Sequence, residues 1–402
     1  MTDQETLLFS GHNQDAIQLR NRSLALQLLK LNGTMSRKEL AARTGLNAST
    51  ITYIIKDLLE MGLVRETGSI ARHNTIGLAL NPDGRYVVGV QLARDRLSGG
   101  LFNLDARILA AERVALAPDL PVAEVLQWLA ELIARLRGRS PDPAKVAAIG
   151  LTAPGPLNLA EGRVAFISNF KGWRDIAIGP AIREHFGLPA VIEHDAHAAA
   201  AAEKWLGGGK TARNLIYIAA GKGVGAGIII DGRIYHGSHG MAGEIGHTTL
   251  VPDGPRCECG NVGCLEGYCS SAALLRRAAA RLAAGREISL LAAERPLTFP
   301  ALVRATQAGD PLTLELVRES ARYLATAVVN LINTLEPELV ILGDEMAELG
   351  PVWIDAVRTT VRARLLPEIA RQVRIEAASL AGDPFLLGTG AIAIEYLLSH
   401  PG

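Results

Sequence analysis

The chain has 402 residues, 49% of them hydrophobic, and its 41 lysines and arginines are balanced by 41 aspartates and glutamates. This length predicts two or three domains with large cores, and the balanced charge gives no global field that would attract nucleic acid or a membrane. The first residues lack the apolar region of a signal peptide, and no apolar run is long enough to span a bilayer. We therefore expect a cytoplasmic protein without membrane insertion.

Residues 1–80 are predicted to form a separate DNA-binding module. Apolar residues recur at helical spacing from Asp15 to Leu31, which predicts a first helix. Ser36, with Glu39 three positions later, has the pattern of a capping box that begins a second helix. Gly45 is placed to end that helix.

A third helix is predicted to follow, capped by Asn47 or Ser49 and ending near Gly62. Two helices joined by a short turn with glycine are typical of a helix-turn-helix. Its polar face carries short donors and acceptors suited to base edges and phosphates. The predicted DNA-contacting residues are Arg37, Asn47, Ser49, Thr50, Thr52, Tyr53, Lys56 and Arg72.

The segment LVRETGSIARHNTIGLAL (63–80) reads as strand, tip and strand, which predicts a wing with Arg72 and His73 at its tip. An arginine on a wing can enter a narrow minor groove. Residues 1–80 hold nine lysines and arginines against seven acidic residues, so one copy should bind DNA weakly and a dimer on a two-fold operator is expected. The alternative is a helical hairpin that contacts another protein.

After the turn-rich joint Asn81–Gly84, the pattern changes to that of an α/β protein. Strands are predicted at 86–92, 97–103 and 108–114, and the same order returns at 214–220, 226–232 and 233–237. This repetition predicts a duplicated domain with two lobes and a ligand between them. Further along, we expect helices at 195–207 and 319–337, a strand at 338–344, and a glycine turn followed by a closing helix within 383–400.

All four cysteines lie within thirteen residues, which favours a metal site over disulfides in a chain without an export signal. Three of them have the spacing C-x-C-x4-C, and His247 is the best fourth ligand for a structural zinc ion. Cys269 is the competing fourth ligand, and the absence of any metal is the remaining alternative. The predicted Zn²⁺ ligands are His247, Cys257, Cys259 and Cys264, which would clamp the neighbouring Glu244 and Glu266.

The segments EIGH (244–247) and CxCGxxGCxE (257–266) resemble the signature of the ROK family of sugar kinases and transcriptional repressors. The resemblance covers essentially the whole chain, because many ROK repressors begin with a winged helix-turn-helix. It implies an α/β, actin-like fold with two ribonuclease-H-like lobes. The expected domains are the winged helix-turn-helix (1–80), lobe 1 (81–200 plus 385–402) and lobe 2 with the zinc site (201–384).

The resemblance also implies a sugar site, in which carboxylates and an amide would distinguish one arrangement of hydroxyls from another. Asp195 matches the general base of ROK kinases, and His194 stands where those kinases usually have asparagine. Taken alone, Glu244 and Asp195 would more often be surface carboxylates, and Asp195 could simply cap a helix. Asn169 alone would more often be a turn residue. The implied sugar-binding residues are Gly155, Asn169, His194, Asp195, Glu244, His247 and Glu266.

Two glycine loops hold the nucleotide in ROK kinases, and the first usually reads D-x-G-G-T-K. Here Gln91 replaces the metal-organising aspartate, and Ala93 to Asp95 replace the small residues. Side chains there would crowd a phosphate, and Asp95 would repel it. The second loop, Gly221–Gly227, keeps its glycines but carries Lys222.

We therefore expect a non-enzymatic, sugar-responsive repressor that binds operator DNA as a homodimer or tetramer. The alternatives are an active sugar kinase that also binds DNA and a repressor that a membrane transport protein sequesters.

Overall fold

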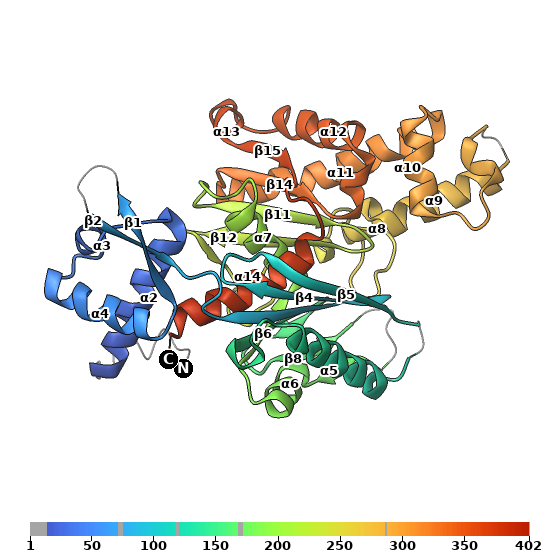
Figure 1. Ribbon diagram of the computed structural model, residues 1–402. Helices are drawn as coiled ribbons and strands as arrows, with labels where there is room; N and C mark the ends of the chain where they lie inside the picture. The colour runs from blue at the N-terminus through green and yellow to red at the C-terminus, as the bar shows by residue number, and fades with distance from the viewer. Residues whose placement is uncertain (1–13, 71–74, 118–119, 168–171, 286–287, 402) are drawn as a thin grey trace. The chain divides into compact units, whose positions relative to one another are not determined.

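The computed structural model describes residues 14–70, 75–117, 120–167, 172–285 and 288–401 (Figure 1). The chain divides into two compact units, which we call unit 1 and unit 2. Unit 1 contains Met1–Thr152, Ala177–Ile192 and Thr389–Gly402, and unit 2 contains Ala153–Ile176 and Glu193–Gly388.

Unit 1 begins with the winged helix-turn-helix, and its predicted helix signals are confirmed. Ser36 and Glu39 form the reciprocal capping box, and Gly45 ends the second helix with φ of +72°. Asn47, rather than Ser49, caps the third helix by accepting the Thr50 N–H at 2.8 Å. The elements are α2 (Gln14–Asn32), α3 (Arg37–Thr44), α4 (Ala48–Glu60), β1 (Val64–Ile70) and β2 (Thr75–Leu80), and β1 pairs with β2 antiparallel.

One stripe of α4 supplies the core of this module. Ile51, Ile55 and Leu58 are fully buried and recur at the spacing that aligns side chains on one face of a helix. Leu40 of α3 is buried with them. Tyr53, on the other side of α4, is 54% exposed.

The rest of unit 1 is built on a five-stranded sheet in the order β10-β6-β3-β4-β5. β3 pairs antiparallel with β4 and parallel with β6, and β4 pairs antiparallel with β5. The elements of this region are β3 (Tyr86–Leu92), β4 (Arg96–Asn103), β5 (Ile108–Ala115), α5 (Val122–Gly138), η1 (Pro143–Lys145), β6 (Val146–Ala153), α6 (Ile178–Phe186) and β10 (Ala190–His194).

Unit 2 repeats the arrangement with the order β13-β12-β11-β14-β15. β11 pairs antiparallel with β12 and parallel with β14, as β3 does with β4 and β6. The repeat confirms the predicted duplicated α/β fold. The strands of unit 2 are β7 (Leu157–Asn158), β8 (Arg163–Phe166), β9 (Arg174–Ile176), β11 (Leu215–Ala220), β12 (Val224–Ile230), β13 (Arg233–Ile234), β14 (Leu339–Gly343) and β15 (Arg374–Ala377).

Alternating side chains of β11 fill two cores on opposite faces of this sheet. Leu215 and Tyr217 lie in the core that includes the alanines of α7, whereas Ile216 and Ile218 lie in the core that includes α11. The helices are α7 (Asp195–Leu206), η2 (Ile245–His247), α8 (Glu266–Cys269), α9 (Ser271–Ala283), η3 (Leu290–Ala293), α10 (Phe299–Gln307), α11 (Pro311–Leu335), η4 (Glu345–Leu349), α12 (Pro351–Arg362), α13 (Pro367–Gln372) and α14 (Pro384–Ser399).

The predicted glycine turn before the closing helix is wrong, because α14 is continuous from Pro384 to Ser399. Its glycines allow close packing instead of a turn. A Cβ at Gly388 would lie 2.4 Å from the Ala198 backbone, and one at Gly390 would lie 2.8 Å from the Phe102 ring.

Within unit 1, α14 also lies near the first helix of the DNA-binding module. The Gln27 side-chain amide donates to the Ser399 hydroxyl at 3.5 Å. Burial lowers the pKa of Lys30 well below its usual value, and the carboxylates of Glu395 and Asp105 oppose that shift. Lys30 of α2 therefore interacts electrostatically with two residues beyond the DNA-binding module.

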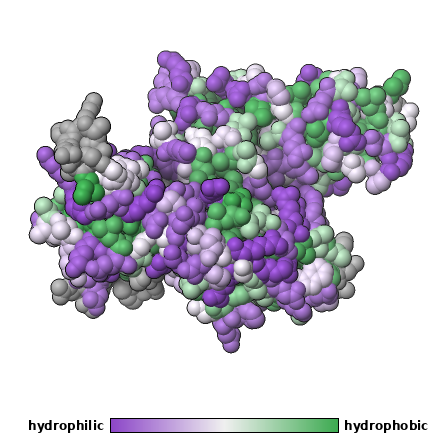
Figure 2. Space-filling view, in the orientation of Figure 1, coloured by the Kyte–Doolittle hydropathy of each residue, from purple (hydrophilic) through white to green (hydrophobic). Residues whose placement is uncertain are grey.

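Hydrophilic residues cover much of the face seen in Figure 2, and hydrophobic ones gather in separate patches. Within the described ranges, none of the helices combines the length and the apolar character needed to cross a membrane.

We predict that Gly150→Ala destabilises the protein, because a Cβ on this β6 residue would lie 2.1 Å from the Thr389 carbonyl oxygen of α14. Overpacking of this kind costs about 1–3 kcal/mol in the free energy of unfolding. Gly138→Ala at the end of α5 is the control, since a Cβ there meets nothing within 4 Å. Urea unfolding of both variants checks this, and equal midpoints would contradict the packing argument.

Candidate functional site

The predicted DNA-contacting residues lie on α3, on α4 and at its N-cap Asn47, apart from Arg72, which falls outside the described residues. Tyr53 and Lys56 are exposed on α4, and the Lys56 ammonium lies 3.8 Å from the Glu60 carboxylate. Arg37, at the start of α3, forms an ion pair of 3.1 Å with Glu66 of β1.

The smaller polar residues at the start of α4 are engaged with the helix itself. The Ser49 hydroxyl donates to the Asn47 side-chain oxygen at 2.7 Å, and the Thr52 hydroxyl donates to the Ala48 carbonyl at 2.8 Å. Asn47 is occupied as the N-cap, and Thr50 donates its N–H to that cap. Tyr53 and Lys56 are therefore the longest side chains that this face offers to DNA.

Four of the predicted sugar-binding residues lie together in unit 2. The His194 Nε2 is 3.6 Å from a Glu244 carboxylate oxygen, and the His194 Nδ1 is 3.3 Å from an Asp195 oxygen. A Cβ at Gly155 would lie 2.7 Å from the His194 ring and 3.3 Å from Glu244. Glycine at 155 thus lets the backbone approach the His194 ring and the Glu244 carboxylate closely.

Glu266 lies against the glycine loop between β11 and β12. Its carboxylate accepts the Val224 N–H at 3.0 Å, and a Cβ at Gly223 would come within 2.9 Å of the same oxygen. A Cβ at the next glycine, Gly225, would lie 3.5 Å from the His194 ring. The loop therefore connects Glu266 to the group around His194.

A second carboxylate, Asp344, follows β14 and meets the start of this loop. A Cβ at Gly221 would lie 2.2 Å from an Asp344 oxygen. Burial, together with the negative charges of Asp195 and Glu345, raises the pKa of Asp344 to about 7. The glycine loop thus faces carboxyl groups at both Gly221 and Val224.

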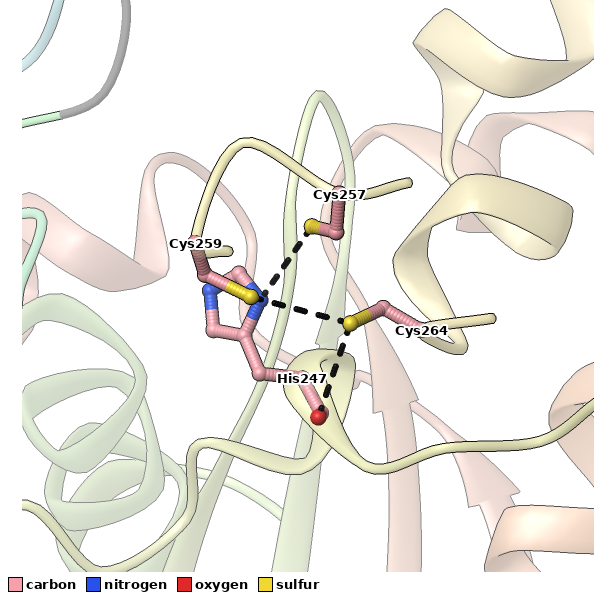
Figure 3. Close-up of side chains that lie close together, drawn as sticks. All are labelled: His247, Cys257, Cys259 and Cys264. Atoms are coloured by element: carbon pink, nitrogen blue, oxygen red, sulfur yellow. Dashed lines mark hydrogen bonds between the residues drawn. The ribbon is translucent and has the colours of Figure 1, made fainter. Parts of the chain in front are cut away.

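The predicted metal ligands form a compact cluster (Figure 3). The ligand atoms of His247, Cys257, Cys259 and Cys264 all lie within 4.8 Å of one another. The Cys257 sulfur is 3.8 Å from the His247 Nδ1, and the Cys259 and Cys264 sulfurs are 3.7 Å apart. A tetrahedral ion with bonds of about 2.3 Å has ligand-to-ligand edges of about 3.8 Å, so these side chains could hold a metal ion.

Cys269, the competing ligand, lies elsewhere. It is fully buried, and its thiol donates to the Leu265 carbonyl at 3.4 Å. All four cysteines are free of disulfides. Burial, followed by the neighbouring thiols of Cys259 and Cys257, raises the pKa of Cys264 to about 12. Asn169, the remaining predicted sugar ligand, lies outside the described residues.

A second group of side chains, which the sequence patterns do not predict, lies next to His194: Glu193, His197 and His236. The His194 and His197 rings are 5.6 Å apart between centroids. The spacing of Glu193 and His197, four residues apart, could have suggested a pair. Nothing in the local sequence connects them to His236, 39 residues further along.

Comparison with known proteins agrees with this geometry. Residues 87–396 match the ROK family, and residues 20–65 match a winged helix-turn-helix DNA-binding family. A xylose repressor from Bacillus spizizenii is 30% identical over 391 residues, which cover 96% of this chain and 98% of that protein.

Two solved structures are similar as well. A ROK family transcriptional regulator, a homologue of the Escherichia coli Mlc protein, superposes with a TM-score of 0.85 at 29% identity and covers 96% of this chain and 97% of its own. A ROK family glucokinase from Streptomyces griseus, in complex with glucose and AMPPNP, has a TM-score of 0.68 at 30% identity. It covers 77% of this chain and 99% of its own.

We predict that the pKa of Asp344 makes stability depend on pH. The folded-state pKa of about 7 exceeds the usual 3.8, so the stability gained from the neutral carboxyl is full below pH 3.8 and is lost as the pH rises through 7. Between pH 5 and pH 8, the wild type should lose about 3 kcal/mol of unfolding free energy relative to Asp344→Asn. Urea unfolding at each pH measures this, with the exposed Asp253→Asn as control. Parallel profiles for the wild type and Asp344→Asn would contradict it.

Proposed function

The chain belongs to the ROK family, and from this we propose that it is a transcriptional repressor whose binding to operator DNA is controlled by a sugar. The observation that carries the proposal is the match of nearly the whole chain, DNA-binding module included, to proteins named as repressors and transcriptional regulators. The glucokinase instead covers 77% of this chain.

The DNA would be contacted by the exposed face of α4, with Tyr53 and Lys56 reaching furthest, and by Arg72 of the wing. A homodimer would present two such faces to a two-fold operator. A sugar that binds one arrangement of the lobes more tightly than another would shift the population between a DNA-binding and a non-binding state.

The sugar would lie against Gly155, His194, Asp195, Glu244 and Glu266. Ionised carboxylates accept hydrogen bonds from hydroxyls, and imidazole both donates and accepts, so the group can recognise a specific ring of hydroxyls. The close contact of Gly155 with His194 and Glu244 supports this assignment, because any larger residue would fill the space beside them.

We assign Zn²⁺ to His247, Cys257, Cys259 and Cys264, because three thiolates and one imidazole are a donor set that zinc favours in structural sites. The ligands flank the sugar-binding carboxylates: Glu244 lies three residues before His247, and Glu266 lies two residues after Cys264. With all four positions taken by protein, the ion would hold these two segments together and take no part in chemistry.

A sugar kinase is the second candidate, supported by the similar glucokinase that was solved with AMPPNP. The carboxyl group of Asp344 weighs against it, since a nucleotide phosphate at Gly221 would meet that group. The first glycine loop of the kinases is also altered here, at Gln91 and at Ala93 to Asp95, and this is a second argument against kinase activity. ATP turnover with a hexose panel at ordinary enzyme rates would establish the kinase instead.

We expect a cognate sugar to change operator affinity at least tenfold in a fluorescence anisotropy titration, and Glu244→Gln to abolish the change while leaving sugar-free DNA binding intact. The reason is that the amide replaces a carboxylate oxygen by a donor, which mismatches a sugar hydroxyl that donates. Glu368→Gln, an exposed residue of α13, is the control. If no pentose, hexose or amino sugar changes the affinity of the wild type, the sugar-controlled mechanism is wrong.

We expect the purified protein to contain zinc, and Cys259→Ser to lose it from this site, since a neutral hydroxyl is a poor ligand for zinc. Cys269→Ser, at the cysteine outside the cluster, should keep the ion. Metal analysis after gel filtration measures both. Equal zinc in the two variants would exclude the assigned ligand set.

A further inference from the structure

Glu193, His197 and His236 bring together three segments of unit 2: the end of β10, the first turn of α7 and the loop after β13. One Glu193 oxygen lies 2.9 Å from the His197 Nδ1, and the other lies 2.7 Å from the His236 Nε2. Glu193 and His197 are buried, whereas the side chain of His236 is 42% exposed. Glu193 and His197 therefore hold the group in the protein interior, and His236 exposes it to solvent on one side.

The second nitrogen of His197 decides what this group can bind. The His197 Nε2 lies 2.9 Å from the Ala242 carbonyl oxygen, which can only accept, so Nε2 carries a proton. A neutral ring then turns the lone pair of Nδ1 towards the Glu193 carboxylate. Two lone pairs at this distance repel each other, so either a second proton or a metal ion has to lie between them.

We propose that Glu193, His197 and His236 bind a divalent transition-metal ion such as Zn²⁺, at a site separate from the cysteine cluster. Two imidazoles and one carboxylate are a known zinc donor set, which leaves a further coordination position for water. The ligand atoms of the three residues all lie within 4.8 Å of one another. The side chain of His236 is 42% exposed, so an ion can reach the site from solvent.

The surroundings of the group match those of metal ligands. Metal-bound histidines usually donate their other ring N–H to a carbonyl or carboxylate, as His197 does to Ala242. The Glu193 oxygen nearer His197 also accepts the His194 N–H at 2.9 Å. The backbone and both rings thus hold the Glu193 carboxylate in a fixed orientation.

An ion here would fasten the loop that contains His236 and Ala242 to α7. Glu244 follows Ala242 by two residues, so the ion would also position a carboxylate of the sugar site. This consequence rests on the proposed function, whereas the metal site itself does not.

The test compares His236→Ala with His239→Ala, which removes an exposed histidine three residues away in the same loop. Both positions are open to solvent, so both variants should fold. Full-length protein is stripped of metal and titrated with Co²⁺. Cobalt on cysteine sulfur gives intense thiolate-to-metal absorption, whereas cobalt on nitrogen and oxygen gives weak bands only, so the spectra separate the two sites.

We expect the wild type and His239→Ala to bind one equivalent of Co²⁺ beyond the thiolate-bound one. His236→Ala should bind that equivalent at least tenfold more weakly and keep the thiolate absorption unchanged. The proposal is overturned if the wild type binds no equivalent beyond the thiolate site, in which case the three side chains form a hydrogen-bonded ion pair. It is also overturned if His236→Ala binds like the wild type. Neither outcome depends on whether the protein binds sugar or DNA.

Discussion

The candidate site depends on how closely the backbone of β12 approaches its neighbours. A Cβ at Gly227 would lie 2.1 Å from the Ala196 carbonyl oxygen of α7, and one at Gly243 would lie 2.0 Å from the Ala226 carbonyl oxygen of β12. Glycine is required at both positions, because any side chain would push the segments apart. The close approach brings α7, which begins at Asp195, and the segment leading to Glu244 to the same strand.

The glycines of β12 therefore have a structural role, which is to permit this close approach of the backbone, and that role requires no bound nucleotide. The Val224 N–H, which could have met a phosphate, donates to Glu266 instead. In the proposed repressor, the loop of an ancestral phosphate site would serve to hold a sugar-binding carboxylate.

Much of the fold could be predicted because its signals are local or repeated. The caps Ser36, Asn47 and Gly45 act over three or four residues, and the strand order of unit 1 recurs in unit 2. The glycines of α14 were misread as a turn, since their reason is tertiary: they face Ala198 and Phe102, far away in sequence. The joining of His236 to Glu193 was missed for the same reason.

The site residues also fall into those that local spacing predicts and those whose contacts only the structure shows. The cluster of three cysteines with His247 could be predicted from spacing, because its ligands come from one short stretch of chain. The positions of Arg72 and Asn169 remain predictions, as they lie outside the described residues. The partners of Glu266 and Asp344 in the glycine loop needed coordinates, since spacing alone does not say which N–H a carboxylate accepts.

Lys30 has a consequence for engineering. Chimeric regulators are made by cutting at an interdomain joint, here Asn81–Gly84, and exchanging the DNA-binding module for that of a relative. Glu395 and Asp105, both beyond the cut, favour the charged form of Lys30 against the burial that disfavours it. A donor module without a cation at this position would remove the positive charge with which Glu395 and Asp105 interact. Whether a donor DNA-binding module is compatible with the rest of the chain therefore depends on the residue at position 30 of α2 as well as on the length of the linker.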